Sequence, residues 1–186
     1  MEPTLPTTTT APPPPQADFD DFYRQHRARM VATVNAVTRA GADAATEAVD
    51  EAFVRALIQW ERVRLMDAPA GWVFTVARNE VTRTRSRKAR EDELAPGSHL
   101  GPQAAVEPQH EAKRVLWDAV AALPERQRLA VALRYLADLT EDQVASTMGI
   151  ARGTVAATLH SARQTLAASL AEPAIGTRTT KDARHA

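Results

Sequence analysis

The chain has 186 residues, 44% of them hydrophobic, which suits one domain or two small ones and excludes a large multidomain protein. Lysine plus arginine equal aspartate plus glutamate at 23 each, so any affinity for nucleic acid must come from local clusters of charge. Cysteine is absent, which excludes disulfide frameworks and thiolate metal sites. With no secretion signal and no apolar run of about 18 residues, we expect a cytoplasmic protein without a membrane span.

The N-terminal part of the chain predicts a tail followed by two helices. Residues 1–17 are almost wholly proline and threonine and should form a disordered tail. From Asp18, apolar residues recur every three or four positions, which predicts a helix that ends at Gly41. A second helix is expected over 44–60. Its apolar residues include Val54, Leu57 and Ile58, so we expect it to be buried over most of its circumference.

The rest of the chain predicts a third helix, a linker and a second helical module. Pro69 suits the first turn of the third helix. Residues 91–108 hold three prolines, two glycines and four acids, which is typical of a flexible linker. Helical periodicity resumes near Gln109, breaks at Pro124 and continues to about 170, with a disordered tail over 171–186. The predicted fold is therefore all-α, with modules over 18–90 and 109–170.

Few residues of the sequence support catalysis. The five histidines show no metal-ligand spacing, and phosphate-binding glycine loops and the serine-hydrolase elbow are missing. Acid pairs such as Glu141–Asp142 are better explained as helix starts than as acid–base dyads. We therefore expect no enzyme activity, no metal site and no cofactor.

Residues 139–160 carry the signals of a helix-turn-helix. Thr140 and Gln143 have the spacing of a capping box, Gly149 suits the turn, and Val155 and Leu159 should pack the second helix. A helical hairpin that touches no DNA is the alternative. In a DNA-binding hairpin, the outward residues near the start of the second helix reach the major groove.

A basic run over 78–90 is the second notable feature. It holds six basic residues and one acid, Glu80. Such a run is usually a solvated helix end, but this one includes Asn79 and follows Trp72 in the same helix. Cations beside an aromatic or amide side chain suit a separated nucleic-acid strand, which needs phosphate neutralisation and base contacts.

Taken together, these segments resemble the extracytoplasmic-function (ECF) group of the sigma-70 family of bacterial RNA polymerase sigma factors, over roughly 18–170. The motifs that carry the resemblance are ATEAVDEAF (45–53), WVFTVARNEVTRTRSRKAR (72–90) and ALPERQRLAVALRYLADLTEDQVASTMGIARGTVAATLHSAR (122–163). The modules would then be a sigma region 2-like three-helix module and a sigma region 4-like helix-turn-helix module.

The resemblance implies partners and roles. The partners would be core RNA polymerase, promoter DNA and, as for many members of the family, an anti-sigma factor. Core polymerase would contact Glu47, Asp50, Glu51 and Val54. The minus-ten element would be melted and read by Arg78, Asn79, Arg83, Arg85, Arg87 and Lys88. The minus-thirty-five element would be contacted by Arg152, Thr154, Ala156, Ala157, Thr158, His160, Ser161 and Arg163.

The second helix of the hairpin departs from the family pattern. Ala156, Ala157, Thr158 and Ser161 stand where lysine, serine and arginine are usual, and Ala151 replaces a serine at the expected N-cap. The alternative function is a free-standing helix-turn-helix regulator, which would have no use for an acidic docking helix in a separate module. A helical interaction protein or a small enzyme would leave both the hairpin and the basic run unexplained.

Overall fold

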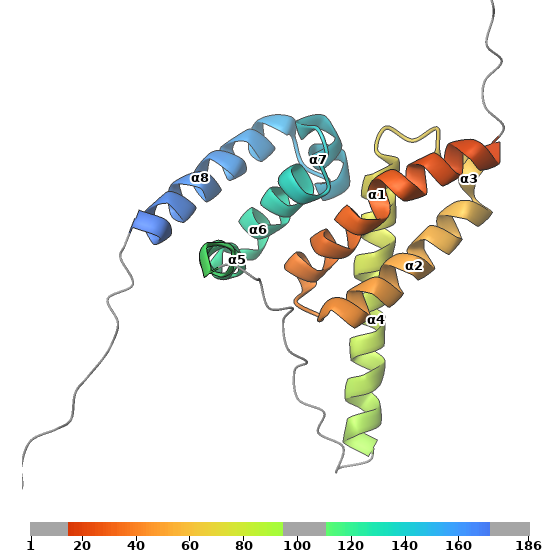
Figure 1. The fold of residues 1–186 in the computed structure, drawn as a ribbon, viewed down its shortest axis with the longest axis horizontal. Helices are drawn as coiled ribbons and strands as arrows, with labels where there is room; N and C mark the ends of the chain where they lie inside the picture. Colours follow the sequence, from red (N-terminus) through yellow and green to blue (C-terminus); the bar gives the residue numbers. More distant parts are fainter. Residues whose placement is uncertain (1–14, 95–110, 172–186) are drawn as a thin grey trace, which may run out of the picture.

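The computed structural model describes residues 15–94 and 111–171, and every regular element in these two ranges is helical. Figure 1 shows the arrangement, with the expected all-α class confirmed. The elements are α1 (Pro15–Thr38), α2 (Ala42–Ile58), α3 (Trp60–Val63), α4 (Pro69–Leu94), α5 (Glu111–Ala122), α6 (Glu125–Val131), the π-helical turn η1 (Ala132–Leu136), α7 (Glu141–Met148) and α8 (Arg152–Ala171).

The first module packs α1, α2 and α4 around an apolar core. Phe53, Phe74, Met30, Val34 and Val49 are among its most deeply buried side chains. At one end of this core, rings from α1 meet rings from α2 and α3 at centroid distances of 4.9–6.5 Å. These rings belong to Phe19, Phe22, Tyr23, Phe53 and Trp60. Aromatic contacts of this kind stabilise a core beyond the burial of their area.

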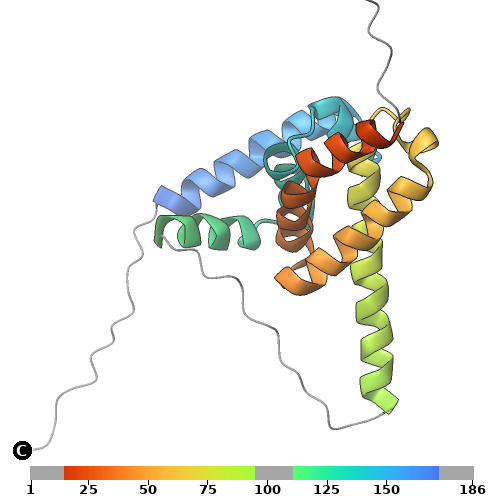
Figure 2. The same cartoon turned by 45° about the vertical axis from the view of Figure 1, so that its right-hand side comes forward.

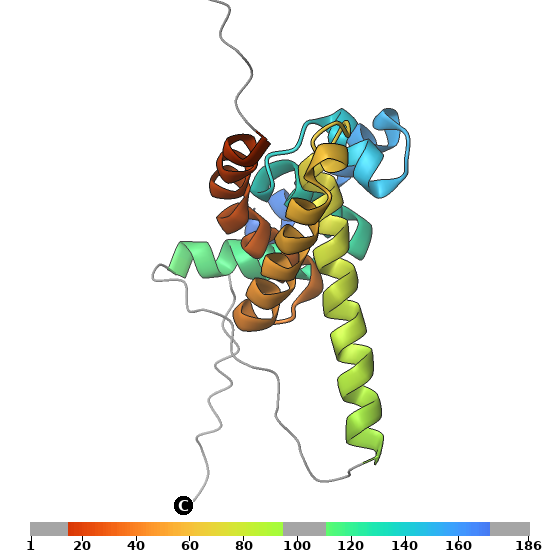
Figure 3. The same cartoon turned by 90° about the vertical axis from the view of Figure 1, so that its right-hand side faces the viewer.

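Helix boundaries differ from the expected ones at several points. Helix α1 begins at Pro15, inside the expected tail, and ends at Thr38 rather than Gly41 because Arg39 takes a left-handed φ of 55°. Helix α4 begins at Pro69 as expected, and it continues to Leu94, into the expected linker. Its last turns project beyond the bundle (Figure 3). The rest of the linker and both tails lie outside the described residues.

The second module follows its local sequence signals closely. Pro124 is the N-cap of α6. A proline cannot continue the preceding helix, so it separates α5 from α6. The capping box at Thr140 and the left-handed Gly149, with φ of 65°, frame α7 as predicted. Before α7, the π-helical turn η1 is followed by Asp138, which has a left-handed φ of 58°.

The two modules pack directly against each other. Helix α1 lies between α2 and the second module and contacts α5, α6 and η1, while the start of α4 contacts α7 (Figure 2). Buried residues of both modules, such as Met30 and Leu133, belong to one continuous core cluster. A linker between two modules was predicted, but this direct contact was not.

His26 on α1 lies near the second module. Its ring packs against Phe22 at an interplanar angle of 48°, and its Nδ1 is buried without a hydrogen-bond partner among the described residues. Burial and the nearby Arg29 lower the pKa of His26, and the carboxylate of Asp138 in the second module offsets part of this effect.

No helix in the described ranges is both long enough and apolar enough to cross a membrane.

Candidate nucleic-acid and polymerase interfaces

The acidic face of α2 is partly occupied by internal ion pairs. Arg27 binds both carboxylate oxygens of Asp50 at 2.7 Å, which joins α1 to α2. Arg55 bridges Glu51 at 2.9 Å and Glu80 at 3.0 Å, which joins α2 to α4. Among the described residues, only Glu47 of the three candidate acids makes no ion pair. Glu47 is therefore the acid best placed for an external cation.

The end of α2 exposes apolar side chains. Val54 is 52% exposed, Leu57 47% and Ile58 77%. The expectation that this helix is buried over most of its circumference is therefore wrong, because the rest of the first module packs only on the side of Val49 and Phe53. Val54 lies close to the acids of α2, so the exposed surface combines an apolar part with Glu47.

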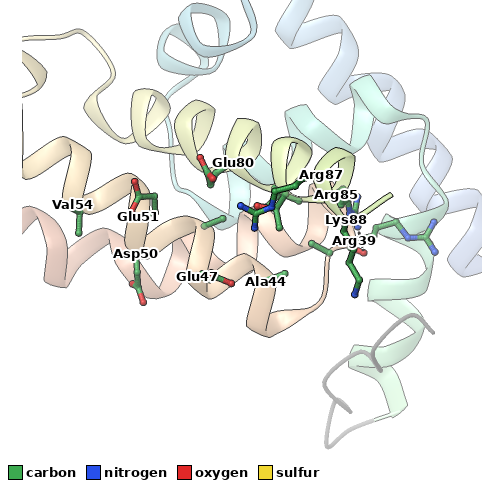
Figure 4. A pocket seen from close by; sticks show the side chains of 14 residues that line it. Arg39, Ala44, Glu47, Asp50, Glu51, Val54, Glu80, Arg85, Arg87 and Lys88 are labelled. Carbon is green, nitrogen blue, oxygen red and sulfur yellow. Dashed lines mark hydrogen bonds between the residues drawn. The ribbon is translucent and has the colours of Figure 1, made fainter. Parts of the chain in front are cut away.

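A groove of about 960 Å³ lies between α2 and α4. Figure 4 shows the acids of α2 along one side and a cluster of basic residues from α4 at one end, beside Arg39. Charged residues lining it are Arg39, Glu47, Asp50, Glu51, Glu80, Arg85, Arg87 and Lys88. Arg39 was not among the predicted site residues. Nothing in the local sequence predicts that Arg39 takes the left-handed conformation at the end of α1.

The predicted minus-ten residues fall into two groups along α4. Arg78 is half-buried, whereas Asn79, Arg83, Arg87 and Lys88 are exposed. Arg83 and Arg87 have long ion pairs, 3.5 Å to Glu80 and 3.8 Å to Glu91, which solvent and DNA phosphates can compete for.

Arg85 is the exception in the basic run. Its guanidinium donates two hydrogen bonds of 2.8 Å, to the carbonyl oxygens of Thr38 and Arg39. These carbonyls end α1 and lack partners within that helix. Arg85 therefore caps α1 in this structure. This structural role is additional to the phosphate contact that the sequence predicts for Arg85.

The hairpin has the geometry expected of a helix-turn-helix. The amide of Gln143 donates to Oγ1 of Thr140 at 3.2 Å, and Oε1 of Gln143 accepts from the amide of Thr140 at 3.0 Å. Val144, Val155 and Leu159 are buried between α7 and α8. These contacts fix α8 as the second helix and leave its opposite face free.

The predicted minus-thirty-five residues differ in their exposure along α8. Arg152, Thr154, Ala157, His160 and Arg163 are exposed, whereas Ala156, Thr158 and Ser161 are half-buried. Ser161 accepts a hydrogen bond of 3.1 Å from Gln127 of α6, so its hydroxyl is already engaged.

Arg152 lies at the start of α8 and faces the acidic first turn of α7. Its Nε lies 3.4 Å from Glu141 and 3.7 Å from Asp142. The two carboxylates offset the charge of Arg152. Arg163 and His160 are therefore better candidates for contacts with DNA. In the ranges that the structure describes, no group of three or more histidine or acidic residues could hold a metal ion.

Comparisons with known proteins agree with this geometry. Residues 22–91 match the family model described as Sigma-70 region 2, and residues 113–166 match Sigma-70, region 4. These segments correspond to the α1–α4 module and to the module that contains the hairpin. The chain belongs to the sigma-70 family of RNA polymerase sigma factors.

Individual relatives indicate the group within the family. An RNA polymerase sigma-E factor of Streptomyces antibioticus is 31% identical over 144 residues, 74% of this chain and 76% of that protein. The sigma-E factor of Streptomyces coelicolor is 26% identical over 74% of this chain and 77% of its own length. The ECF RNA polymerase sigma factor RpoE of Cereibacter sphaeroides is 31% identical over 52% of this chain, and the match spans 57% of that protein. The chain is thus an ECF-type sigma factor, and the free-standing regulator is not favoured.

A solved structure has the same fold. It is the sigma factor RpoE in complex with the anti-sigma factor NepR from Bartonella quintana, with a TM-score of 0.65 and 21% sequence identity. The match covers 82% of this chain and 96% of that one, so it extends over both modules.

Proposed function

We propose that this sigma factor carries core RNA polymerase to a specific set of promoters, and that its own residues bind and position but catalyse no reaction. The observation that carries the proposal is the pairing of a region 2 module, with exposed Asn79 and cations on α4, and a region 4 module with an exposed recognition helix. Core polymerase supplies the active site. The chain supplies contacts to polymerase and to two promoter elements.

Core polymerase is proposed to dock on α2 around Glu47 and Val54. An exposed acid without an internal partner, on the same face of α2 as a half-exposed valine two turns further on, suits a protein surface that combines a cation with an apolar side chain. Asp50 and Glu51 contribute less directly, because their carboxylates hold Arg27 and Arg55 in place. They are positioning residues for the docking face.

The minus-ten element is proposed to be melted and read along α4. Asn79 carries an exposed amide that can donate and accept hydrogen bonds at a base edge, and Arg83, Arg87 and Lys88 can neutralise phosphates. By resemblance, the segment over 61–68 holds an unstacked base; it was expected to be a loop, but its first three residues belong to α3 and only the part from Arg64 to Ala68 is non-helical. Flipping a base costs a few kcal/mol, which contacts in such a pocket must offset.

The minus-thirty-five element is proposed to be contacted by α8, with a small electrostatic contribution. Thr154, Ala157, His160 and Arg163 are exposed on the free face of the helix. Methyl groups of threonine and alanine can contact thymine in the major groove, and each missing phosphate contact makes binding less dependent on salt. Specificity therefore depends mainly on the minus-ten module.

Run-off transcription tests the proposal. Purified core polymerase is given a pool of genomic fragments with and without the chain, and the transcripts are sequenced. We expect discrete start sites only when the chain is present, with a shared minus-ten sequence upstream of them. A chain that binds duplex fragments by itself yet produces no transcript with core polymerase would instead be a free-standing regulator.

A further inference from the structure

We propose that Arg39, at the end of α1, is a further DNA-binding residue, which neutralises a backbone phosphate beside the one bound by Lys88 of α4. This inference deepens the proposed function and rests on it, because it adds a residue to the surface that binds the minus-ten element. The sequence motifs that carry the family resemblance and the basic run over 78–90 do not include Arg39. The fold brings it to that surface from a different helix.

The backbone of Arg39 is fixed to α4. The guanidinium of Arg85 donates hydrogen bonds of 2.8 Å to the carbonyl oxygens of Thr38 and Arg39. Within α1, the amide of Arg39 donates to the carbonyl oxygen of Asn35 at 2.8 Å, and the amide of Gly41 donates to Oδ1 of Asn35 at 3.1 Å. The turn that carries Arg39 is thus held against the basic part of α4.

Arginine is not the residue that this turn favours. Arg39 has a left-handed φ of 55°, a conformation that glycine adopts most readily at the end of a helix, with asparagine as the next choice. Its side chain is exposed and makes no ion pair with another described residue. No internal charge pair therefore accounts for an arginine here. A side chain that departs from the local preference in this way points to an external contact.

Arg39 adds a cation to one end of the groove between α2 and α4, where Arg85, Arg87 and Lys88 also lie (Figure 4). Of these four cations, only Arg87 has an ion pair within the described residues, at 3.8 Å to Glu91. A cluster of cations with so little internal compensation attracts an anion, and nucleic acid offers closely spaced phosphates.

The acids of the same groove suit a different partner. Three of them are engaged by arginines of the bundle, Asp50 by Arg27 and both Glu51 and Glu80 by Arg55. The fourth, Glu47, is the acid proposed to meet a cation of core polymerase. A polymerase surface with cations is repelled by the basic end of the groove, whereas DNA phosphates are attracted to it. We therefore assign Arg39 to DNA rather than to an acid of the polymerase.

The spacing along α4 fits one continuous nucleic-acid surface. Arg85 and Lys88 follow Asn79 by six and nine residues, which is about 9 Å and about 14 Å along the helix. Arg39 lies beside this stretch because its carbonyl oxygen is bound by Arg85. Successive phosphates of one strand are about 3.4 Å apart along the duplex axis, so these distances correspond to about three to four base pairs. A strand whose base contacts Asn79 can thus present a phosphate to Arg39.

Salt titration of promoter binding by the holoenzyme tests the proposal. Arg39→Asn removes the charge and suits the left-handed backbone, so the fold should be kept. We expect the salt slope to fall by about 0.9, so that a four-fold rise in salt weakens the wild type about 3.5-fold more than the variant. Arg39→Lys keeps the charge and should keep the wild-type slope. An unchanged slope for Arg39→Asn would overturn the proposal.

Two controls accompany the titration. Arg24→Asn makes the same charge change at an exposed position of α1, about 22 Å along the helix from Arg39, and should keep the wild-type slope. Binding to core polymerase without DNA, measured by anisotropy, should have the wild-type Kd for Arg39→Asn. A weaker Kd would place Arg39 against an acid of the polymerase, and the proposal would be wrong.

A cleavage probe locates the contact. Because the chain has no cysteine, an iron chelate that generates hydroxyl radicals can be attached at Arg39→Cys. In the holoenzyme–promoter complex we expect cuts about three to four base pairs from the base assigned to Asn79, overlapping those from Lys88→Cys. The same probe at Arg24→Cys should leave these positions intact. Absence of cuts from Arg39→Cys, or cuts that do not overlap those from Lys88→Cys, would refute the contact.

This inference and the proposed function can fail separately. Specific run-off transcripts together with a salt slope that does not depend on residue 39 would reject the role of Arg39 alone. A chain that gives no specific transcript with core polymerase would reject the proposed function itself.

Discussion

Arg27 on α1 and Asp50 on α2 form two parallel hydrogen bonds of 2.7 Å between guanidinium and carboxylate. This geometry is the strongest that an arginine and an acid can adopt, and the bond to Asp50 raises the pKa of Arg27. Asp50, one of the acids that resemblance assigns to polymerase docking, thus holds its own helix against α1. Docking and stability should therefore depend on different acids of the same face.

Reversing Glu47 to lysine should weaken binding to core polymerase by about ten-fold, which corresponds to about 1.4 kcal/mol. The thermal midpoint should stay unchanged, because Glu47 makes no ion pair within the described residues. Fluorescence anisotropy with labelled protein gives the affinity. Asp20→Lys makes the same charge change at an exposed position of α1 and is the control. Unchanged affinity for Glu47→Lys would show that this face is not the interface.

Asp50→Ala should have the opposite profile. Losing the partner of Arg27 should lower the thermal midpoint by a few degrees, as expected for a half-exposed ion pair in a chain of this size. Polymerase binding at a temperature well below the midpoint should fall less than for Glu47→Lys. Calorimetry and anisotropy on the same samples separate the two effects. A larger loss of affinity for Asp50→Ala than for Glu47→Lys would mean that Asp50 contacts polymerase directly.

Arg85 and Lys88 should differ although they lie one turn apart. Lys88→Ala should reduce the salt slope of promoter binding by the holoenzyme by about one unit, as one phosphate contact is lost. Arg85→Ala should in addition lower stability, by about 1 kcal/mol, because two carbonyl oxygens at the end of α1 lose their donor. Salt titrations and urea unfolding measure the two quantities. Equal stability of the two variants would contradict the capping role.

Asn79→Ala should change which promoters open, whereas Lys88→Ala should weaken all of them alike. The amide can contact a base edge, while an ammonium group near the backbone reads charge only. A randomised minus-ten library, transcribed by holoenzyme with each variant and sequenced, shows the preference. Identical profiles for both variants would remove Asn79 from base reading.

His26 should make the folded protein less stable in mild acid. Its pKa is lowered in the folded state by burial and by Arg29, so the unfolded chain binds the proton more readily. The stability contribution is present above pH 6.5, the usual value for histidine, and is lost as the pH falls from there towards the lower folded pKa. Urea unfolding at pH 7.5 and 5.5 should show this loss. His26→Gln should reduce it, whereas His160→Gln, at an exposed position of α8, should not.

Local signals predicted much of the fold. Pro69, Pro124, Gly149 and the capping box at Thr140 each act within a few residues, so their effects could be inferred without a structure. The exposure of Leu57 was missed because periodicity identifies an apolar stripe but does not show whether another element covers it.

Long-range contacts had no local sign. Arg85 caps carbonyls 46 and 47 positions earlier, and Gln143 reaches a carbonyl 76 positions away. A basic run or a capping residue looks the same in the sequence whether or not such a partner exists. The candidate site could therefore be located on its helices, while the division of its residues between structural and binding roles required the fold.

The shared core has a consequence for how the protein unfolds. Because buried residues of both modules form one cluster, the free chain should melt in a single cooperative transition rather than in two.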